Sequence, residues 1–232
     1  MPPGFQEYPD GGGGSHSDMT GRVVSLNVGV PRAVPWHGRT VTSAIWKTPV
    51  DGRRRLAGVN VEGDDQADRR VHGGPTKAVY AYAVEDYAWW QGRDPAAFEP
   101  GTFGENLTVA GIVPAAAVVG ERWQVGTAVL RVTEPRIPCY KLGLRMGDAA
   151  FVDRFAAAAR PGTYLAIEEE GEVGAGDRIE LIHRPDHGLT VGMVERAYHG
   201  HPALLDALVD NADLSGGWRH WAEQARARAG GA

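Results

Sequence analysis

The chain has 232 residues, of which 43% are hydrophobic and 23% are charged, and its formal net charge is −5. This size and composition predict a globular protein with one large domain, or one domain and a small appendage. The acidic balance argues against a general nucleic-acid binder, which needs a clearly basic face. No stretch approaches the roughly 18 uninterrupted apolar residues of a membrane-spanning helix.

The first 20 residues are expected to form a disordered, glycine-rich tail. A run of four glycines and a serine at 11–15 is typical of a flexible linker, and the segment lacks the basic region and apolar core of a signal peptide. Cys139 is the only cysteine, which excludes a disulfide within the chain. Together these features predict a cytoplasmic protein.

Residues 21–184 are predicted to form a mainly β domain. Short strand-forming runs alternate with turn signals, and in the last run Ile179 and Leu181 would face inward while Arg178 and Glu180 face water. Two helical insertions are expected, at 85–91 and 149–159, and a turn cluster at 171–177. The expected strands are 22–28, 39–47, 56–61, 77–83, 106–109, 128–133, 163–168 and 177–183. Many short, evenly spaced strands are typical of a closed or nearly closed barrel.

Residues 187–230 are predicted to form a three-helix extension. Thr190 can cap a first helix, Pro202 suits the first turn of a second, and Ser215 can cap a third. Four arginines against five acids argue against a helix-turn-helix DNA reader. The apolar side chains of this extension could pack on the barrel or form a homodimer contact; they are Leu204, Leu205, Leu208, Trp218 and Trp221.

Cys139 lies in the segment PRIPCYK, residues 135–141. A lone cysteine excludes a multi-cysteine zinc site, which leaves a nucleophile, a single soft-metal ligand or an inert buried side chain. Two prolines fix the backbone around the thiol, and Arg136, Lys141 and Arg145 lie close in sequence. Nearby cations favour the thiolate, which is the reactive and metal-binding form.

Two glycine-containing turns carry further candidate residues. The stretch RRVHGGPTK at 69–77 has four potentially cationic side chains and no acid, and its paired glycines, Gly73 included, permit a sharp turn beside His72. The stretch GTFGEN at 101–106 delivers Glu105 and Asn106 at the start of a strand. Each stretch also has a plainer interpretation: a surface turn with an incidental histidine, and side chains that bond the local backbone.

The distribution of cations points to an anionic ligand. The chain is acidic overall, yet residues 69–77 and 131–147 are locally basic, and a concave site rich in such groups would attract a phosphate. Lys47 and Arg32 follow predicted strands or turns and individually indicate little. No Walker or Rossmann glycine pattern suggests a nucleotide cofactor.

Six stretches, taken in order, resemble the MOSC-domain family, the domain found at the C-terminus of molybdenum cofactor sulfurases, and specifically its YiiM-like branch. They are NVGVPR at 27–32, KTPV at 47–50, EGDDQAD at 62–68, VHGG at 71–74, FGENL at 103–107 and PRIPC at 135–139. The resemblance runs from about residue 22 to residue 182, and the C-terminal segment is similar to the three-helix extension of that branch. The glycine-rich tail has no counterpart in it.

The resemblance implies a β-barrel that binds a molybdopterin-type molybdenum cofactor. It implies a reductase of N-hydroxylated bases and related N-oxygenated compounds, such as 6-N-hydroxylaminopurine, with electrons from separate partner proteins. Cys139 would anchor the metal and His72 would be a proton donor or cofactor contact. The cofactor would be held or its pocket shaped by Arg32, Lys47, Gly73, Glu105, Asn106 and Arg136.

Two other functions remain open from the sequence. MOSC domains include members that handle sulfur, so the chain could be a sulfur or cofactor carrier in which Cys139 holds a persulfide. A cysteine hydrolase that pairs Cys139 with His72 would need an orienting partner for the histidine and an oxyanion hole.

Overall fold

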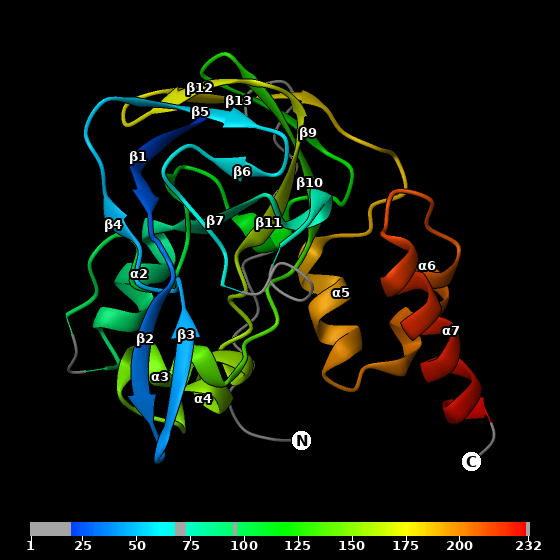
Figure 1. The fold of residues 1–232 in the computed structure, drawn as a ribbon. Helices are drawn as coiled ribbons and strands as arrows, with labels where there is room; N and C mark the ends of the chain where they lie inside the picture. Colours follow the sequence, from blue (N-terminus) through cyan, green and yellow to red (C-terminus); the bar gives the residue numbers. More distant parts are fainter. Residues whose placement is uncertain (1–19, 68–72, 95–96, 231–232) are drawn as a thin grey trace.

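Seven strands of the computed structural model form a closed barrel (Figure 1). The structure describes residues 20–67, 73–94 and 97–230, so His72 and residues 1–19 of the expected N-terminal tail lie outside the described residues, whereas Thr20 already belongs to β1. β1 pairs with both β8 and β13, which closes the sheet, and all neighbours are antiparallel except β7 and β8. In order around the barrel the strands are β1 (Thr20–Val28), β13 (Arg178–His183), β9 (Arg122–Val125), β10 (Ala128–Glu134), β11 (Thr163–Glu169), β7 (Val79–Ala83) and β8 (Leu107–Ala110). The mainly β barrel expected from the sequence is confirmed.

β7 separates two hydrophobic cores. All five of its residues are buried, and alternate side chains face opposite ways because a strand has a period of two. Val79, Ala81 and Ala83 belong to the core of the barrel, whereas Tyr80 and Tyr82 belong to an aromatic cluster outside it. That cluster is completed by residues of α2 (Val84–Gln91), α3 (Tyr140–Met146) and α4 (Phe151–Ala157). The helices α2 and α4 confirm the expectations at 85–91 and 149–159.

Several strands differ from the expectation because tertiary pairing decides them. Residues 56–61 form a hairpin of β5 (Arg53–Ala57) and β6 (Asn60–Val61), with Gly58 at φ +59° in the turn, rather than one strand. The expected turn cluster at 171–177 begins with β12 (Gly171–Gly174), which pairs with β5. The expected strand 39–47 ends at Ser43 and belongs to a separate hairpin of β2 (Arg32–Trp36) and β3 (Arg39–Ser43). The short β4 (Thr48–Pro49) pairs with the end of β1.

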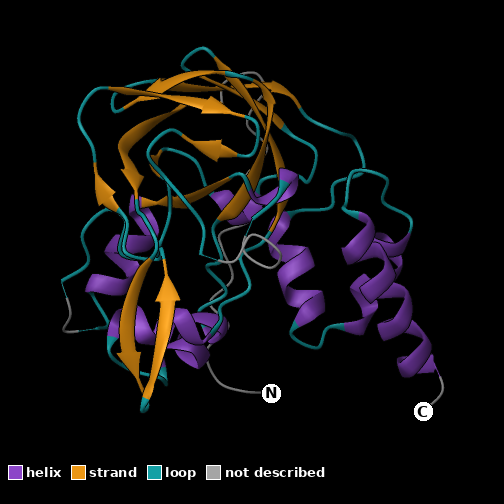
Figure 2. Ribbon diagram, in the orientation of Figure 1, coloured by secondary structure: helices purple, strands orange, loops and turns teal. Residues whose placement is uncertain are grey.

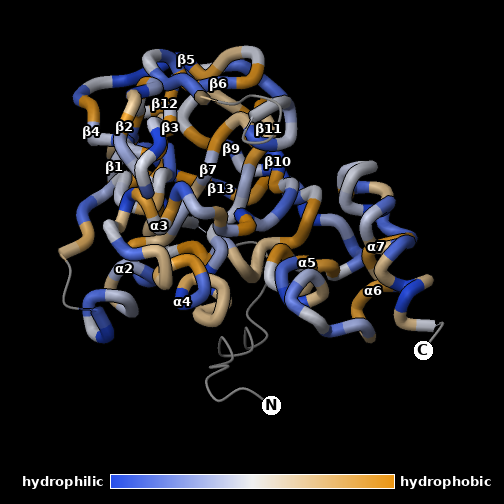
Figure 3. The backbone as a smooth tube through the Cα atoms, turned by 60° about the horizontal axis from the view of Figure 1, so that its bottom comes forward, coloured by the Kyte–Doolittle hydropathy of each residue, from blue (hydrophilic) through white to orange (hydrophobic). Residues whose placement is uncertain are grey.

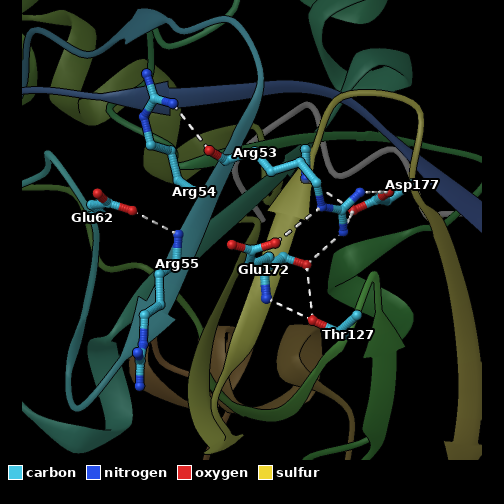
Figure 4. Close-up of polar contacts among 8 residues, drawn as sticks. Arg53, Arg54, Arg55, Glu62, Thr127, Glu172 and Asp177 are labelled. Atoms are coloured by element: carbon cyan, nitrogen blue, oxygen red, sulfur yellow. Dashed lines mark hydrogen bonds and ion pairs between the residues drawn. The ribbon is translucent and has the colours of Figure 1, made fainter.

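A polar network fastens the barrel end that carries β12 and β5 (Figure 4). The guanidinium of Arg53 donates to both carboxylate oxygens of Asp177, at 2.8 and 2.9 Å, and to the carbonyl of Glu172 at 2.7 Å. The Glu172 amide donates to the Thr127 hydroxyl at 2.8 Å. Gly126 has φ +57°, and a Cβ there would lie 2.4 Å from the Glu172 carbonyl oxygen, so only glycine fits. The network lies at the end of the barrel opposite the pocket described below.

The C-terminal helices pack on the barrel (Figures 1 and 2). They are α5 (Val191–Tyr198), α6 (Leu205–Val209) and α7 (Gly216–Gly230), with a 3-10 turn at Pro202–Leu204 between α5 and α6. Another 3-10 turn, Pro114–Ala116, lies between β8 and β9 of the barrel. The expected caps form: Thr190 accepts from the Met193 amide at 3.2 Å, and Ser215 accepts from the Trp218 amide at 3.5 Å. Leu205 and Leu208 join the same buried cluster as the barrel interior, and hydrophobic positions occur in both parts (Figure 3). The homodimer contact stays a prediction. Among the described residues, no helix has the length and apolar character needed to cross a bilayer.

The carboxyl of Glu195 in α5 is buried in this extension. Its residue is 3% exposed, and Oε2 has no hydrogen-bond partner in the described part of the chain. Burial raises the pKa of Glu195 from 4.5 to about 7, although the charge of Arg196 opposes the shift. The folded chain binds this proton more tightly than the unfolded chain. The contribution of proton binding at Glu195 to the free energy of unfolding is therefore complete below pH 4.5 and is lost as the pH rises through 7.

We expect Glu195→Gln to raise the free energy of unfolding at pH 8 by about 1–3 kcal/mol relative to the parent chain. The advantage should vanish at about pH 3.5, one unit below the ordinary carboxyl pKa of 4.5, where the parent carboxyl is protonated in both states. Urea denaturation at the two pH values measures the difference. Burial lowers the pKa of the neighbouring His199, so His199 also makes the stability depend on pH. Comparison of the variant with the parent chain at each pH isolates the part that comes from Glu195. Glu223→Gln, at an exposed position of α7, is the control, and equal effects of the two substitutions would contradict the assignment.

Candidate functional site

A pocket opens at the end of the barrel where β1 and β10 finish and where β7, β8 and β11 begin. It is lined from five segments, 43–47, 65–67, 77–80, 103–106 and 136–141, and by Tyr164. Four cationic side chains reach it, Lys47, Lys77, Arg136 and Lys141. Asp65 supplies the only carboxylate among the described lining residues. The pocket therefore suits an anionic ligand.

Arg136 is the most deeply buried cation of this pocket, at 6% exposure. Its guanidinium carbon lies 5.6 Å from the centre of the Tyr80 ring and 5.3 Å from that of Phe155. Burial lowers the pKa of Arg136, but the electrostatic effects of Tyr80, Tyr164 and Cys139 raise it by more, so that the pKa is raised overall. Nη1 has no hydrogen-bond partner among the described residues. A buried charged donor without a hydrogen-bond partner lowers the free energy of unfolding unless a ligand accepts a hydrogen bond from it.

Cys139 stands at the corner between the β10 segment and α3. Its backbone is extended, with φ −129° and ψ 172°, and its carbonyl accepts from the Leu142 amide at 2.8 Å in the first turn of the helix. The residue is partly exposed and lines the pocket. The next residue, Tyr140, is 51% exposed and does not line it. The corner thus holds the thiol in the pocket beside Arg136, on a backbone fixed by two prolines.

Lys47 and Asn106 line the pocket, but their polar groups already form ion pairs or hydrogen bonds with other residues of the chain. Lys47 forms a short ion pair with Asp64, and burial lowers the pKa of Lys47 although Asp64 opposes the shift. Asn106 donates to Asp64 at 3.0 Å and to the Asn27 carbonyl at 3.3 Å, and accepts from the Tyr80 amide at 3.2 Å. Asp64 also accepts from the Gly29 amide at 2.7 Å. This network braces the pocket wall.

Glu105 lies behind that wall. It is fully buried and is not among the lining residues. Its Oε1 accepts from the Tyr87 hydroxyl, from the Gly101 amide at 2.7 Å and from Thr108 at 2.8 Å, while Oε2 has no partner within the described ranges. Burial raises the pKa of Glu105. The side chain therefore fixes the 101–108 turn from inside.

The remaining residues expected at the site lie outside the described lining. Arg32 is exposed and stacks over Trp46 at 4.0 Å. Gly73 is half-buried and begins the turn that leads into the 3-10 helix η1 (Pro75–Lys77). His72 lies outside the described residues. The structure thus brings together Lys47, Asn106, Arg136 and Cys139 and leaves Glu105, Arg32 and Gly73 outside the lining.

Lys77, Lys141 and Tyr164 were not singled out as site residues from the sequence. Lys77 lies 4.0 Å from the Glu134 carboxylate, and its Nζ is 5.9 Å from the centre of the Tyr164 ring. Both lysines come from the stretches that the sequence marks as locally basic, and that excess of charge is the signal that could have identified them. Tyr164 carries no such signal, because only the pairing of β11 with β7 places it beside Tyr80.

Comparison with known proteins assigns the family. Residues 68–180 match the model of the MOSC domain. The uncharacterized protein YflK of Bacillus subtilis is 36% identical over 200 residues, which span 85% of this chain and 90% of YflK. The chain is a MOSC-domain protein.

Further relatives place this MOSC-domain protein on the YiiM-like branch. Protein YiiM of Escherichia coli is 34% identical over 145 residues, which span 61% of this chain and 65% of YiiM. The crystal structure of YiiM from Geobacillus stearothermophilus superposes with a TM-score of 0.73 at 26% identity, over 89% of this chain and 99% of that one. A Gibberella moniliformis protein named "Reductase" is 30% identical over 76% of this chain, which spans 32% of that protein.

Proposed function

We propose that this MOSC-domain protein binds the molybdenum cofactor in its pocket and reduces N-hydroxylated bases, such as 6-N-hydroxylaminopurine. One observation carries the proposal: the Cys139 thiol shares a pocket with the buried guanidinium of Arg136, whose Nη1 lacks a partner in the described part of the chain. A thiolate is a soft ligand that suits such a metal, and a guanidinium pairs with phosphate or other anionic groups.

The residues present fit an anionic cofactor. Cys139 would hold the metal, and Arg136, Lys77 and Lys141 would hold the phosphate of the pterin. Lys47, neutralised by Asp64, would keep the wall in place rather than supply free charge. When bound, the cofactor supplies the two-electron chemistry that breaks the N–O bond. The overall reaction consumes two electrons and two protons and releases the amine and water.

The electrons are proposed to come from a separate protein in the cytoplasm. An iron–sulfur cluster needs several cysteine ligands, whereas Cys139 is the only cysteine of the chain. The chain also carries no flavin-binding glycine fingerprint. The relative named "Reductase" is consistent with a reductive role.

Removal of the cofactor tests this function. Protein purified from a bacterial host that makes the molybdenum cofactor should reduce 6-N-hydroxylaminopurine to adenine when dithionite-reduced methyl viologen supplies electrons. Protein from an otherwise identical host that lacks cofactor synthesis should show none of this activity, and chromatography of the two bases measures the product. Equal activity of the two preparations would contradict the molybdenum dependence. No activity in either, together with mass spectrometry that finds an added sulfur on Cys139, would favour a persulfide carrier.

A further inference from the structure

The β2–β3 hairpin and the start of α3 form an exposed aromatic groove beside the pocket. The hairpin stands away from the barrel and runs beside α3 (Figure 1), and its two strands pair only with each other in the described structure. Positive φ values at His37, +46°, and Gly38, +74°, form the tight turn at its tip. The groove is lined by Trp36, His37, Arg39, Val41 and Tyr140. We name this region, with its flanking cations, the hairpin–α3 surface.

The hairpin–α3 surface is basic in a chain of net charge −5. The two segments that build it, 29–50 and 135–147, contain six lysines and arginines and no aspartate or glutamate. Lys47 and Arg136 are buried in the pocket. The other four form no ion pair with any described residue; they are Arg32, Arg39, Lys141 and Arg145.

Two of these cations, Arg32 and Arg145, repel each other, and the buried carboxyl of Glu105 offsets only part of that repulsion. Burial lowers the pKa of Arg145, and the neighbouring charge of Arg32 lowers it further. The Nε atom of Arg145 is buried and lacks a hydrogen-bond partner among the described residues. Like charges in such an arrangement repel each other, and an anionic partner would relieve that repulsion.

The groove adjoins the proposed metal site through a single peptide bond. Cys139 lines the pocket, while the next residue, Tyr140, lines the groove and is 51% exposed. Lys141 returns to the pocket. A protein seated on Tyr140 would therefore lie directly beside the thiol that the proposed function assigns to the metal.

We propose that the hairpin–α3 surface docks an acidic electron-carrier protein that delivers electrons to the pocket. The proposal rests on the proposed function, in which each turnover takes two protons from water and two electrons from reduced carrier, either from one flavin or from two one-electron iron–sulfur centres; the carrier leaves oxidised. Trp36, Tyr140 and Arg39 line the groove itself, and Arg32 and Arg145 add positive charge from the same two segments. Tryptophan, tyrosine and arginine are enriched at protein interfaces. In a two-fold contact between two copies of this chain, the two basic surfaces would face and repel each other. A second copy of the chain is therefore disfavoured as the partner on this surface.

Binding of two acidic carriers, a flavodoxin and a [2Fe–2S] ferredoxin, tests the surface. Calorimetry at low and high salt is performed on full-length protein without substrate. We expect at least one carrier to bind, with an affinity that falls with salt, and Arg39→Glu to weaken that binding about tenfold or more. Tyr140→Ala should weaken it similarly through lost packing. Arg178→Glu makes the same charge change on the exposed start of β13, at the barrel end opposite the pocket, and should have less than about a twofold effect.

Three results would overturn the docking proposal: neither carrier binds the parent chain, Arg39→Glu and Arg178→Glu weaken binding equally, or Arg39→Glu dissociates a dimer of this chain. Circular dichroism checks that each variant is folded. The assay with reduced methyl viologen needs no carrier protein. Its failure in the parent chain would count against the proposed function, whereas loss of carrier binding would count against the docking surface alone.

Discussion

Cys139→Ser is expected to lose at least about nine-tenths of its bound molybdenum and of its 6-N-hydroxylaminopurine reductase activity, because a serine hydroxyl is neither soft nor ionised at neutral pH. Removal of groups that only support metal ligands already costs about 10- to 100-fold, so loss of a direct ligand should cost no less. Elemental analysis gives the molybdenum-to-protein ratio, which reports on binding independently of turnover.

Tyr140→Phe is the matched control for this substitution. Tyr140 is the next residue, but it lines the groove outside the pocket, so its variant should keep the molybdenum content of the parent chain. A Cys139→Ser protein that retains both full molybdenum and full reduction would show that the thiol is not the anchor. A Tyr140→Phe protein that also loses the metal would show that the effect belongs to the α3 corner as a whole.

Arg136→Met is expected to reduce retention of the cofactor about 10- to 100-fold, since a hydrogen bond to a charged group contributes about 1.5–3 kcal/mol. Methionine keeps an unbranched chain that can still pack against Tyr80 and Phe155, but it removes the charge. Release of the cofactor during dialysis, followed by its fluorescence after oxidation, measures the change. Arg136→Lys should lie between the two, because lysine keeps the charge but loses the planar fork.

The stability of cofactor-free protein separates a binding role from a structural one for Arg136. Its Nη1 is buried without a partner in the described chain, and replacement of an incompletely paired buried charge by an apolar side chain is often neutral or stabilising. We therefore expect cofactor-free Arg136→Met to unfold at the same urea concentration as the cofactor-free parent, or at a higher one. A marked loss of stability in that state would indicate that Arg136 mainly holds the fold.

Local signals in the sequence predicted those elements that local chemistry decides. The caps at Thr190 and Ser215 were recognisable because a hydroxyl before an apolar helical run has a direct partner in the first turn. The strand β12 was not, because Gly171–Gly174 has no strand-forming pattern and exists through its pairing with β5. The seven-residue α3 contains Gly143 and was missed for a similar reason: burial of Leu142 and Leu144 stabilises it.

The kinds of side chain at the site could be predicted from the sequence, but which of them line the pocket could be predicted only in part. The sequence placed Cys139 and Arg136 together because they are three residues apart, and Lys47 and Asn106 join them in the pocket. Glu105 and Asn106 are adjacent, yet only Asn106 lines the pocket, because the Glu105 carboxylate turns inward to accept from Tyr87, Gly101 and Thr108. Arg32 lies over Trp46 instead, a contact that depends on how the hairpin folds back.

The molybdenum content of the parent chain, purified from a cofactor-competent host grown with molybdate, tests most directly whether the Cys139–Arg136 pocket is a molybdenum-cofactor site. We expect close to one molybdenum atom and one pterin per chain, with both absent from protein made in a host that cannot synthesise the cofactor. Parent protein that contains neither, although a known molybdenum enzyme from the same cells is fully loaded, would contradict this expectation.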